Sequence, residues 1–165
     1  MKFEENTIKN AYSLCDLSNY WLNTPYEIYA ALGAKSKGTV GEEIVKEFLK
    51  TKYFKVEKRV NTGHDAIVNN IKTEIKFSLA SKRNVKYEFT FNHVGVNKNW
   101  ERIIFCGVNG DLEVKMCWFT NEDVKAIIQE SSCFAKQEGP DDFFAMGKNS
   151  TALLNHPYAK NMEDW

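Results

Sequence analysis

The sequence predicts an α/β fold in which a mixed central β-sheet is flanked by helices. An amphipathic helical pattern comes first, several segments with β-branched, aromatic or alternating patterns follow, and a capped helical pattern comes after them. The 165-residue chain is 43% hydrophobic and 13% aromatic, which suits one sizeable core and is too short for two ordinary domains. We therefore predict a single domain over residues 1–165, with its core at about residues 37–130.

The N-terminal part, residues 3–32, has a mostly helical pattern with a break near Asn23-Thr24-Pro25. The stretch from Gly33 to Gly41 contains three glycines and is expected to form a loop. The helix that carries Glu42 should follow this loop.

That helix should gather its apolar residues on one face, because successive residues turn by about 100° around a helix axis. These residues are Gly41, Ile44, Val45, Phe48 and Leu49. Glu42 then lies at the edge of the apolar face, whereas Glu43 points nearly the opposite way. Glu42 is the better candidate to reach a site beside the sheet, and the alternative is that both glutamates are solvated surface charges.

Two apolar runs flank Asn69-Asn70, a pattern that predicts a β-hairpin with a two-residue turn. If Val68 pairs with Ile71 across this turn, stepping outward along both strands brings Asp65 opposite Glu74. Like charges that face each other destabilise a hairpin, and a bound divalent cation is a physical reason to keep them together. The hairpin therefore predicts a Mg²⁺ site.

The second strand of this hairpin alternates polar and apolar residues. Lys72, Glu74 and Lys76 should share one face, and Ile71, Thr73, Ile75 and Phe77 the other. Burial of the apolar face would then leave two carboxylates and a lysine together on one side of the hairpin.

Further strand patterns cover Phe54–Val60, Val85–Phe91, Arg102–Val108 and Leu112–Phe119. Thr120 and Asp123 form a capping-box pattern that opens a helix through about Gln129. The core face of that helix should consist of Val124, Ile127 and Ile128. The predicted order is thus helix, several strands, helix.

Residues 131–165 are expected to form an irregular C-terminal region. Four aromatic residues in it are candidates for a subunit interface, and burial within their own domain is the equal alternative. They are Phe143, Phe144, Tyr158 and Trp165.

The charge balance neither favours nor excludes a polyanion partner. Lys and Arg together number 22, as do Asp and Glu, and an acidic site with a local basic rim would give the same balance. The four cysteines contain no C-x-x-C pair, the N-terminus lacks a signal pattern, and no apolar run approaches the ~18 residues of a membrane helix. These features predict a cytoplasmic protein that does not enter a membrane.

Asp65 followed by Glu74-Ile75-Lys76 resembles the motif of the PD-(D/E)XK nuclease superfamily, an acid on one strand and Glu-x-Lys on the next. The family motif has a proline directly before the first acid, and this chain has His64 at that position. The upstream helix with Glu42 is similar to the family helix that bears a further metal-associated glutamate. The resemblance implies a restriction-endonuclease-like core and hydrolysis of phosphodiester bonds in double-stranded DNA, with Mg²⁺ as cofactor and Mn²⁺ as a substitute.

The resemblance also implies roles for individual residues. Asp65 and Glu74 would coordinate Mg²⁺, joined by the Ile75 carbonyl, and Glu42 would hold a second metal or its water. Lys76 would orient or deprotonate the attacking water. Because neighbouring acids raise a lysine's pKa, we favour positioning over base catalysis, and the plain alternative is a solvated lysine that bridges the two acids.

The segment after the motif strand contains candidates for DNA contact. Lys82, Arg83 and Lys86 could meet phosphates, although a short charge run is more often a solvated surface. Asn92 ends the next strand, where relatives sometimes place a supporting polar residue.

Within the family, the segment from Lys37 to Glu42 resembles archaeal Holliday-junction resolvases, whereas the run from Trp100 to Val108 looks more like small type II restriction endonucleases. We favour restriction, because a resolvase usually has a strongly basic surface. A repair nuclease and a non-catalytic DNA-binding domain of the same fold stay open. A double-strand cut at a symmetric sequence needs two active sites, so we expect a homodimer on DNA.

Overall fold

The computed structural model describes residues 21–52, 54–59, 62–80 and 88–165 of the chain. Its described helices are α2 (Glu27–Ala31), α3 (Ala34–Thr51), α4 (Asn121–Glu130), α5 (Lys148–Leu154) and the short 3-10 helix η1 (Met162–Asp164). A five-stranded sheet has the order β1 (Val56–Lys58), β2 (Ala66–Val68), β3 (Ile71–Leu79), β5 (Arg102–Val108), β6 (Val114–Thr120). A three-stranded sheet has the order β4 (Phe89–Gly95), β8 (Asp142–Gly147), β7 (Ala135–Lys136).

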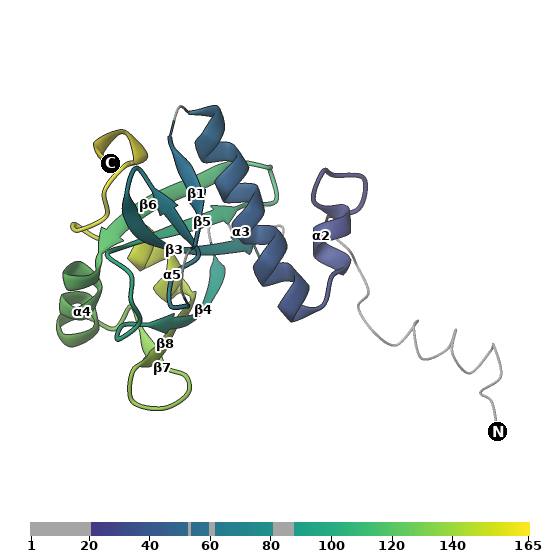
Figure 1. Ribbon diagram of the computed structural model, residues 1–165. Helices are drawn as coiled ribbons and strands as arrows, with labels where there is room; N and C mark the ends of the chain where they lie inside the picture. Colours follow the sequence, from purple (N-terminus) through teal and green to yellow (C-terminus); the bar gives the residue numbers. More distant parts are fainter. Residues whose placement is uncertain (1–20, 53, 60–61, 81–87) are drawn as a thin grey trace, which may run out of the picture.

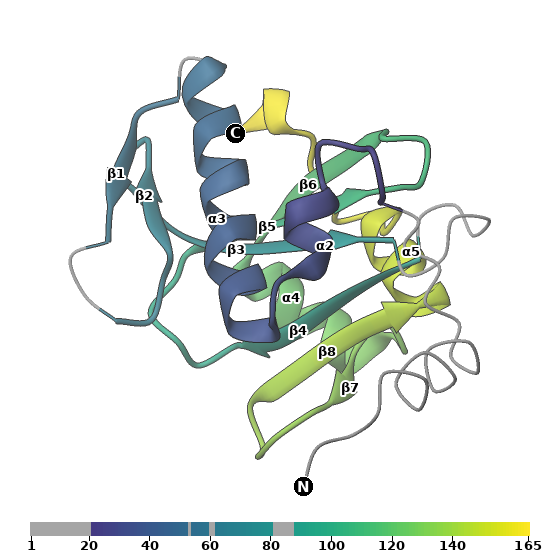
Figure 2. The same cartoon turned by 90° about the vertical axis from the view of Figure 1, so that its right-hand side faces the viewer.

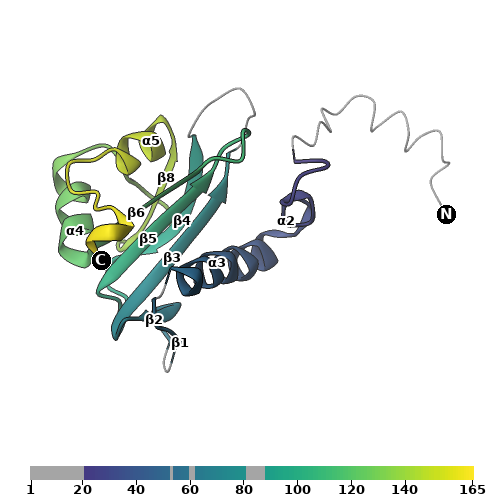
Figure 3. The ribbon, with the colours of Figure 1, turned by 90° about the horizontal axis from the view of Figure 1, so that it is seen from above.

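The larger sheet is mixed, as the sequence predicts. Strand β3 pairs with β5 in parallel, while the pairs β1–β2, β2–β3 and β5–β6 are antiparallel. Helix α3 runs along one side of this sheet, and α4, α5 and β8 lie on the other side (Figures 1 and 3). The architecture is therefore α/β, with a mixed five-stranded sheet covered by helices and a smaller sheet.

The predicted hairpin register is confirmed. Val68 pairs with Ile71 across the turn, and Ala66 pairs with Thr73. Asn69 and Asn70 both have positive φ, 47° and 66°, which matches the tight turn that joins twisted strands and which asparagine tolerates better than most residues. The ladder ends at Ala66, so Asp65 lies just beyond it and is not a ladder partner of Glu74.

Two hydrophobic clusters cover the two faces of the five-stranded sheet. One joins it to α3 and includes Val45, Leu49, Ile75 and Ile104. The other joins the sheet to the three-stranded sheet and to α4 and α5, and it contains most of the buried aromatic rings, including Phe89, Phe91, Phe105, Phe119 and Phe143. Both faces of β3 are therefore covered, and Thr73, Glu74 and Ile75 are all buried.

The predicted loop from Gly33 to Gly41 is wrong, because α3 already begins at Ala34. Gly41 is buried within this helix, and a Cβ atom there would lie 2.8 Å from Phe77 Cβ on β3. The glycine thus serves close helix–sheet packing and not a turn. In the predicted helical part, residues 21–26 form turns and α2 spans only Glu27–Ala31, while residues 1–20 lie outside the described residues.

Three strand boundaries differ from the prediction. Strand β1 is shorter than Phe54–Val60, and β6 begins at Val114, two residues after Leu112. Strand β4 continues past Phe91 to Gly95, and a bulge between Phe91 and Val94 shifts its register with β8. Of the predicted strand Val85–Phe91, residues 85–87 lie outside the described residues.

The C-terminal region is not irregular as predicted. It forms β7, β8 and α5, and along β8 Phe143 and Ala145 alternate with less buried neighbours. Phe143 is only 8% exposed, which favours burial in its own domain, and Trp165 packs edge-to-face against Trp118 with 5.4 Å between ring centroids. The capping box of α4 is confirmed, and Val124 and Ile127 form its buried face.

Figure 2 shows β1 and β2 at one end of the large sheet and the β4–β8–β7 sheet running below it.

None of the helices in the described ranges is long and apolar enough to cross a membrane.

Candidate active site

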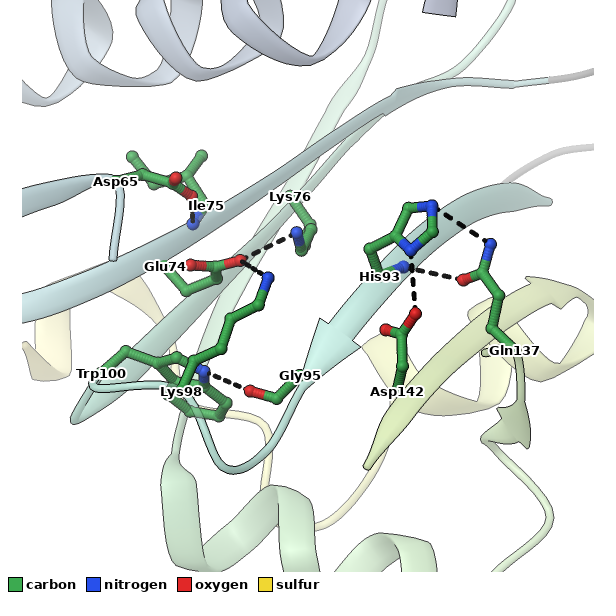
Figure 4. Close-up of polar contacts among 10 residues, drawn as sticks. All are labelled: Asp65, Glu74, Ile75, Lys76, His93, Gly95, Lys98, Trp100, Gln137 and Asp142. Carbon is green, nitrogen blue, oxygen red and sulfur yellow. Dashed lines mark hydrogen bonds and ion pairs between the residues drawn. The ribbon is translucent and has the colours of Figure 1, made fainter. Parts of the chain in front are cut away.

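Asp65 is fixed at the open end of the hairpin by two hydrogen bonds to β3. Its backbone N–H donates to the Thr73 carbonyl at 2.9 Å, and its Oδ2 accepts from the Ile75 N–H at 2.8 Å (Figure 4). The carboxylate thus takes the place of the next ladder partner. This geometry sets Asp65 beside the Glu74-Ile75-Lys76 segment, although the backbone pairing has already ended.

Glu74 is a buried carboxylate with two lysines. It is 3% exposed, Lys76 Nζ lies 2.9 Å from its Oε1, and Lys98 Nζ lies 3.8 Å from the same oxygen (Figure 4). Burial raises the pKa of Glu74, and the Asp65 charge raises it further, while the two lysines lower it. The lysines thus compensate a charge that the interior disfavours.

Glu42 lies at the edge of the buried face of α3, as the helical pattern predicts. Its side chain is 29% exposed, against 57% for Glu43. Burial raises the pKa of Glu42 to about 7, with the Asp65 charge as the next cause, and the positive charges of Lys46 and Lys76 oppose this. Lys46 Nζ is 3.8 Å from Glu42 Oε2 and 3.0 Å from Glu43 Oε1.

The four predicted catalytic residues share one electrostatic environment. Asp65 raises the pKa of both Glu42 and Glu74, and Lys76 lowers both. They come from three different places: Glu42 from α3, Asp65 from the residue before β2, and Glu74 and Lys76 from β3. Three carboxylates and a lysine are therefore close enough to influence one another electrostatically, although the ligating oxygens of the three carboxylates do not all lie within 4.8 Å of one another.

The Ile75 carbonyl is directed toward the same edge. The N–H and C=O of one strand residue point to the same side, and the Ile75 N–H points at Asp65. A backbone oxygen and a carboxylate thus share this edge of β3, and both are oxygen donors of the kind that Mg²⁺ prefers.

Glu42, Asp65 and Glu74 offer oxygen donors of the kind that a small divalent cation takes. Among the described residues, only His93, Glu138 and Asp142 bring three ligating side-chain atoms within 4.8 Å of one another, so the oxygens of these three carboxylates are more widely spaced than that. A cation held by one or two of them would complete its coordination with water. Mg²⁺ is usually held in this way, and it would relieve the repulsion that burial strengthens.

Two lysines of this site are missing from the sequence-based prediction. Lys46 could have been found, since it lies four residues after Glu42 on the same helix. Lys98 gives no such signal, because the turn between β4 and β5 brings it to Glu74 from 24 positions along the chain.

The predicted DNA-contact residues are only partly described. Lys82, Arg83 and Lys86 lie outside the described residues. Asn92 is exposed and lies in the bulge of β4. Its contact with DNA stays a prediction.

The neighbouring residue of that bulge forms a separate polar cluster. His93 has a φ of 55°, its Nδ1 lies 2.9 Å from Asp142 Oδ2, and its N–H donates to Gln137 Oε1 at 2.8 Å (Figure 4). These contacts attach the bulge to the β7–β8 hairpin.

His64 occupies the position that the family name gives to proline. Its ring is 2% exposed, and neither ring nitrogen has a hydrogen-bond partner among the described residues.

No protein-family model matches this sequence, and no curated protein gives a significant match.

Proposed function

We propose that this chain is a Mg²⁺-dependent deoxyribonuclease with a restriction-endonuclease-like core, of the PD-(D/E)XK superfamily. The observation that carries the proposal is the hydrogen bond from the Ile75 N–H to the Asp65 carboxylate, at 2.8 Å. It joins the acid and the Glu-x-Lys segment of the motif in space, in the order that the superfamily uses. Clustered carboxylates with raised pKa values support a catalytic site over a surface patch.

Hydrolysis of a phosphodiester requires that the negative charge of the phosphate is neutralised and that a water molecule is activated. When bound, Mg²⁺ or Mn²⁺ supplies both, by polarising a phosphate oxygen and by lowering the pKa of a bound water. Asp65, Glu74 and the Ile75 carbonyl would hold the cation, and Glu42 would hold a second cation or a water.

Lys76 is suited to orienting the attacking water. Its ammonium already donates to Glu74 Oε1 at 2.9 Å, and its side chain is only 17% exposed. With its ammonium directed at Glu74, Lys76 would work as a hydrogen-bond donor that holds the water and stabilises charge at the phosphate.

We favour a type II restriction endonuclease that acts as a homodimer on duplex DNA. A Holliday-junction resolvase, a repair nuclease or a non-catalytic DNA-binding domain are the alternatives. Of the proposed interface aromatics, Tyr158 is 39% exposed, and Phe144 and Trp165 are partly buried, so these three remain candidates. Cys106, Cys117 and Cys133 are buried free thiols, which supports a reducing cytoplasm as the location.

The test is incubation of the purified protein with plasmid DNA and Mg²⁺, next to the D65N variant. Discrete fragments from the wild-type protein and none from D65N would support a restriction endonuclease. A smear would favour a repair nuclease, and cutting only of a four-way junction would favour a resolvase. Binding of DNA without any cleavage would favour the non-catalytic DNA-binding domain.

A further inference from the structure

Lys98 lies in a rigid turn that follows β4. The Lys98 N–H donates to the Gly95 carbonyl at 3.3 Å, and the Trp100 indole N–H donates to the same carbonyl at 2.8 Å (Figure 4). Trp100 is 4% exposed, so the turn is anchored in the core. The backbone position of Lys98 is therefore set by the fold.

The side chain of Lys98 lies across Gly95. A Cβ atom on Gly95 would stand 2.8 Å from Lys98 Cε and 3.0 Å from Lys98 Cδ, and its three nearest neighbours are all atoms of this lysine. Gly95 has no positive φ, so its backbone would accept any residue. The absence of a side chain at Gly95 makes room for Lys98 to extend toward Glu74.

The two lysines at Glu74 differ in exposure. Lys76 is 17% exposed and hydrogen-bonds the carboxylate, whereas Lys98 is 46% exposed and its Nζ stays 3.8 Å away, beyond hydrogen-bonding distance. Lys98 also lines an open pocket of about 550 Å³, together with the charged residues Glu101, Arg102, Glu122 and Lys125, and none of the four site residues lines that pocket. The exposed ammonium of Lys98 is therefore open to a molecule from solvent while it stays within 3.8 Å of the Glu74 carboxylate.

We propose that Lys98 is a substrate-binding residue that contacts a phosphate oxygen of the DNA strand at the cleavage site, and that Gly95 is required for it to reach this position. The proposal rests on the proposed nuclease function. Three carboxylates repel a polyanion, and an exposed cation beside them offsets that repulsion. An ammonium on a flexible stem binds phosphate as a point charge, without reading the base sequence.

The experiment compares K98A, G95A and the double variant with wild-type protein. Binding of a fluorescent duplex is measured by anisotropy in Ca²⁺ over a series of salt concentrations, with two duplexes of unrelated sequence. K136A is the matched control, because Lys136 is an exposed lysine of β7 that does not line this pocket and makes no ion pair among the described residues. Circular dichroism checks that each variant is folded.

For K98A we expect the slope of log affinity against log salt to fall by about one, equally for both duplexes. G95A should give the same loss although the lysine is present, and the double variant should lose no more than K98A alone. K136A should keep the wild-type slope. In Mg²⁺, K98A should raise KM for cleavage more than it lowers kcat.

An unchanged slope in K98A would overturn the proposal, even if the variant melts at a lower temperature, because Lys98 would then be only a counter-ion of Glu74. Additive losses from G95A and K98A would overturn the role of Gly95. If wild-type protein cuts DNA and K98A binds and cuts it equally well, Lys98 is excluded as a substrate-binding residue and the nuclease function stands. If wild-type protein neither binds nor cuts DNA, both proposals fail together.

Discussion

The carboxylate of Asp65 completes the hydrogen bonding of Ile75, 2.8 Å away across the end of the hairpin. Asp65 therefore has a structural acceptor role in addition to its charge, and the two can be separated by substitution. Asparagine keeps an acceptor oxygen and removes the negative charge, whereas alanine removes both.

We predict that D65N and D65A both lose cleavage activity, by about 100-fold or more, the scale expected for a lost transition-state charge contact. Their stabilities should differ. D65N should melt at or above the wild-type temperature, because it relieves repulsion with Glu74, while D65A should lose about 1 kcal/mol with the Ile75 hydrogen bond. Thermal unfolding and plasmid cleavage check this, and full activity in D65N would contradict a metal-ligand role.

Metal binding should map to the hairpin and not to the His93 cluster. Titration of Mn²⁺, followed by its electron paramagnetic resonance signal, should show weaker binding in E74Q and unchanged binding in H93A. H93A is the matched control because His93, Glu138 and Asp142 also bring ligating atoms within 4.8 Å of one another. If H93A loses Mn²⁺ binding and E74Q does not, the metal site lies at the β4 bulge and not at the hairpin.

The raised pKa of Glu42 predicts a pH dependence of stability. The folded protein holds the Glu42 proton up to about pH 7, whereas the unfolded chain releases it near the usual value of 4.5. Since the folded state then binds more protons, the free energy of unfolding should fall as pH rises from 4.5 to about 7. E42Q should flatten this dependence in thermal melts, and E43Q, on the exposed side of α3, should not.

Two glycines of α3 should respond oppositely to alanine. G41A places a Cβ atom 2.8 Å from Phe77 Cβ and should cost about 1–3 kcal/mol through overpacking. A Cβ atom at Gly38 would instead point into open space, with no atom of another described segment within 4 Å. G38A should therefore stabilise the helix by up to about 1 kcal/mol. Denaturant unfolding of both variants checks the prediction, and equal responses would mean that α3 does not pack closely on β3.

Sequence reasoning succeeded where short-range chemistry decides the structure. The Asn69-Asn70 turn fixes the register of the hairpin, and the Thr120 capping box fixes the start of α4. The orientation of Glu42 follows from helical periodicity. It failed where distant segments decide: Gly41 is a packing glycine because of Phe77, and β8 is a strand because β4 pairs with it. Lys98 reaches Glu74 only through the folded turn, so no local pattern could reveal it.

The hairpin and the second sheet also differ in how they can assemble. Asp65 and Ile75 are joined by a short turn, so their contact closes a small loop at low entropic cost. Strand β4 instead pairs with β8, which lies far along the chain: Phe91 of β4 pairs with Ala145 of β8. Because non-local pairing slows folding, the acidic half of the site can form early, while the turn that delivers Lys98 becomes fixed only after β4 is in place. The repelling carboxylates would then come together before their second lysine arrives, so a divalent cation present during refolding should speed the late steps.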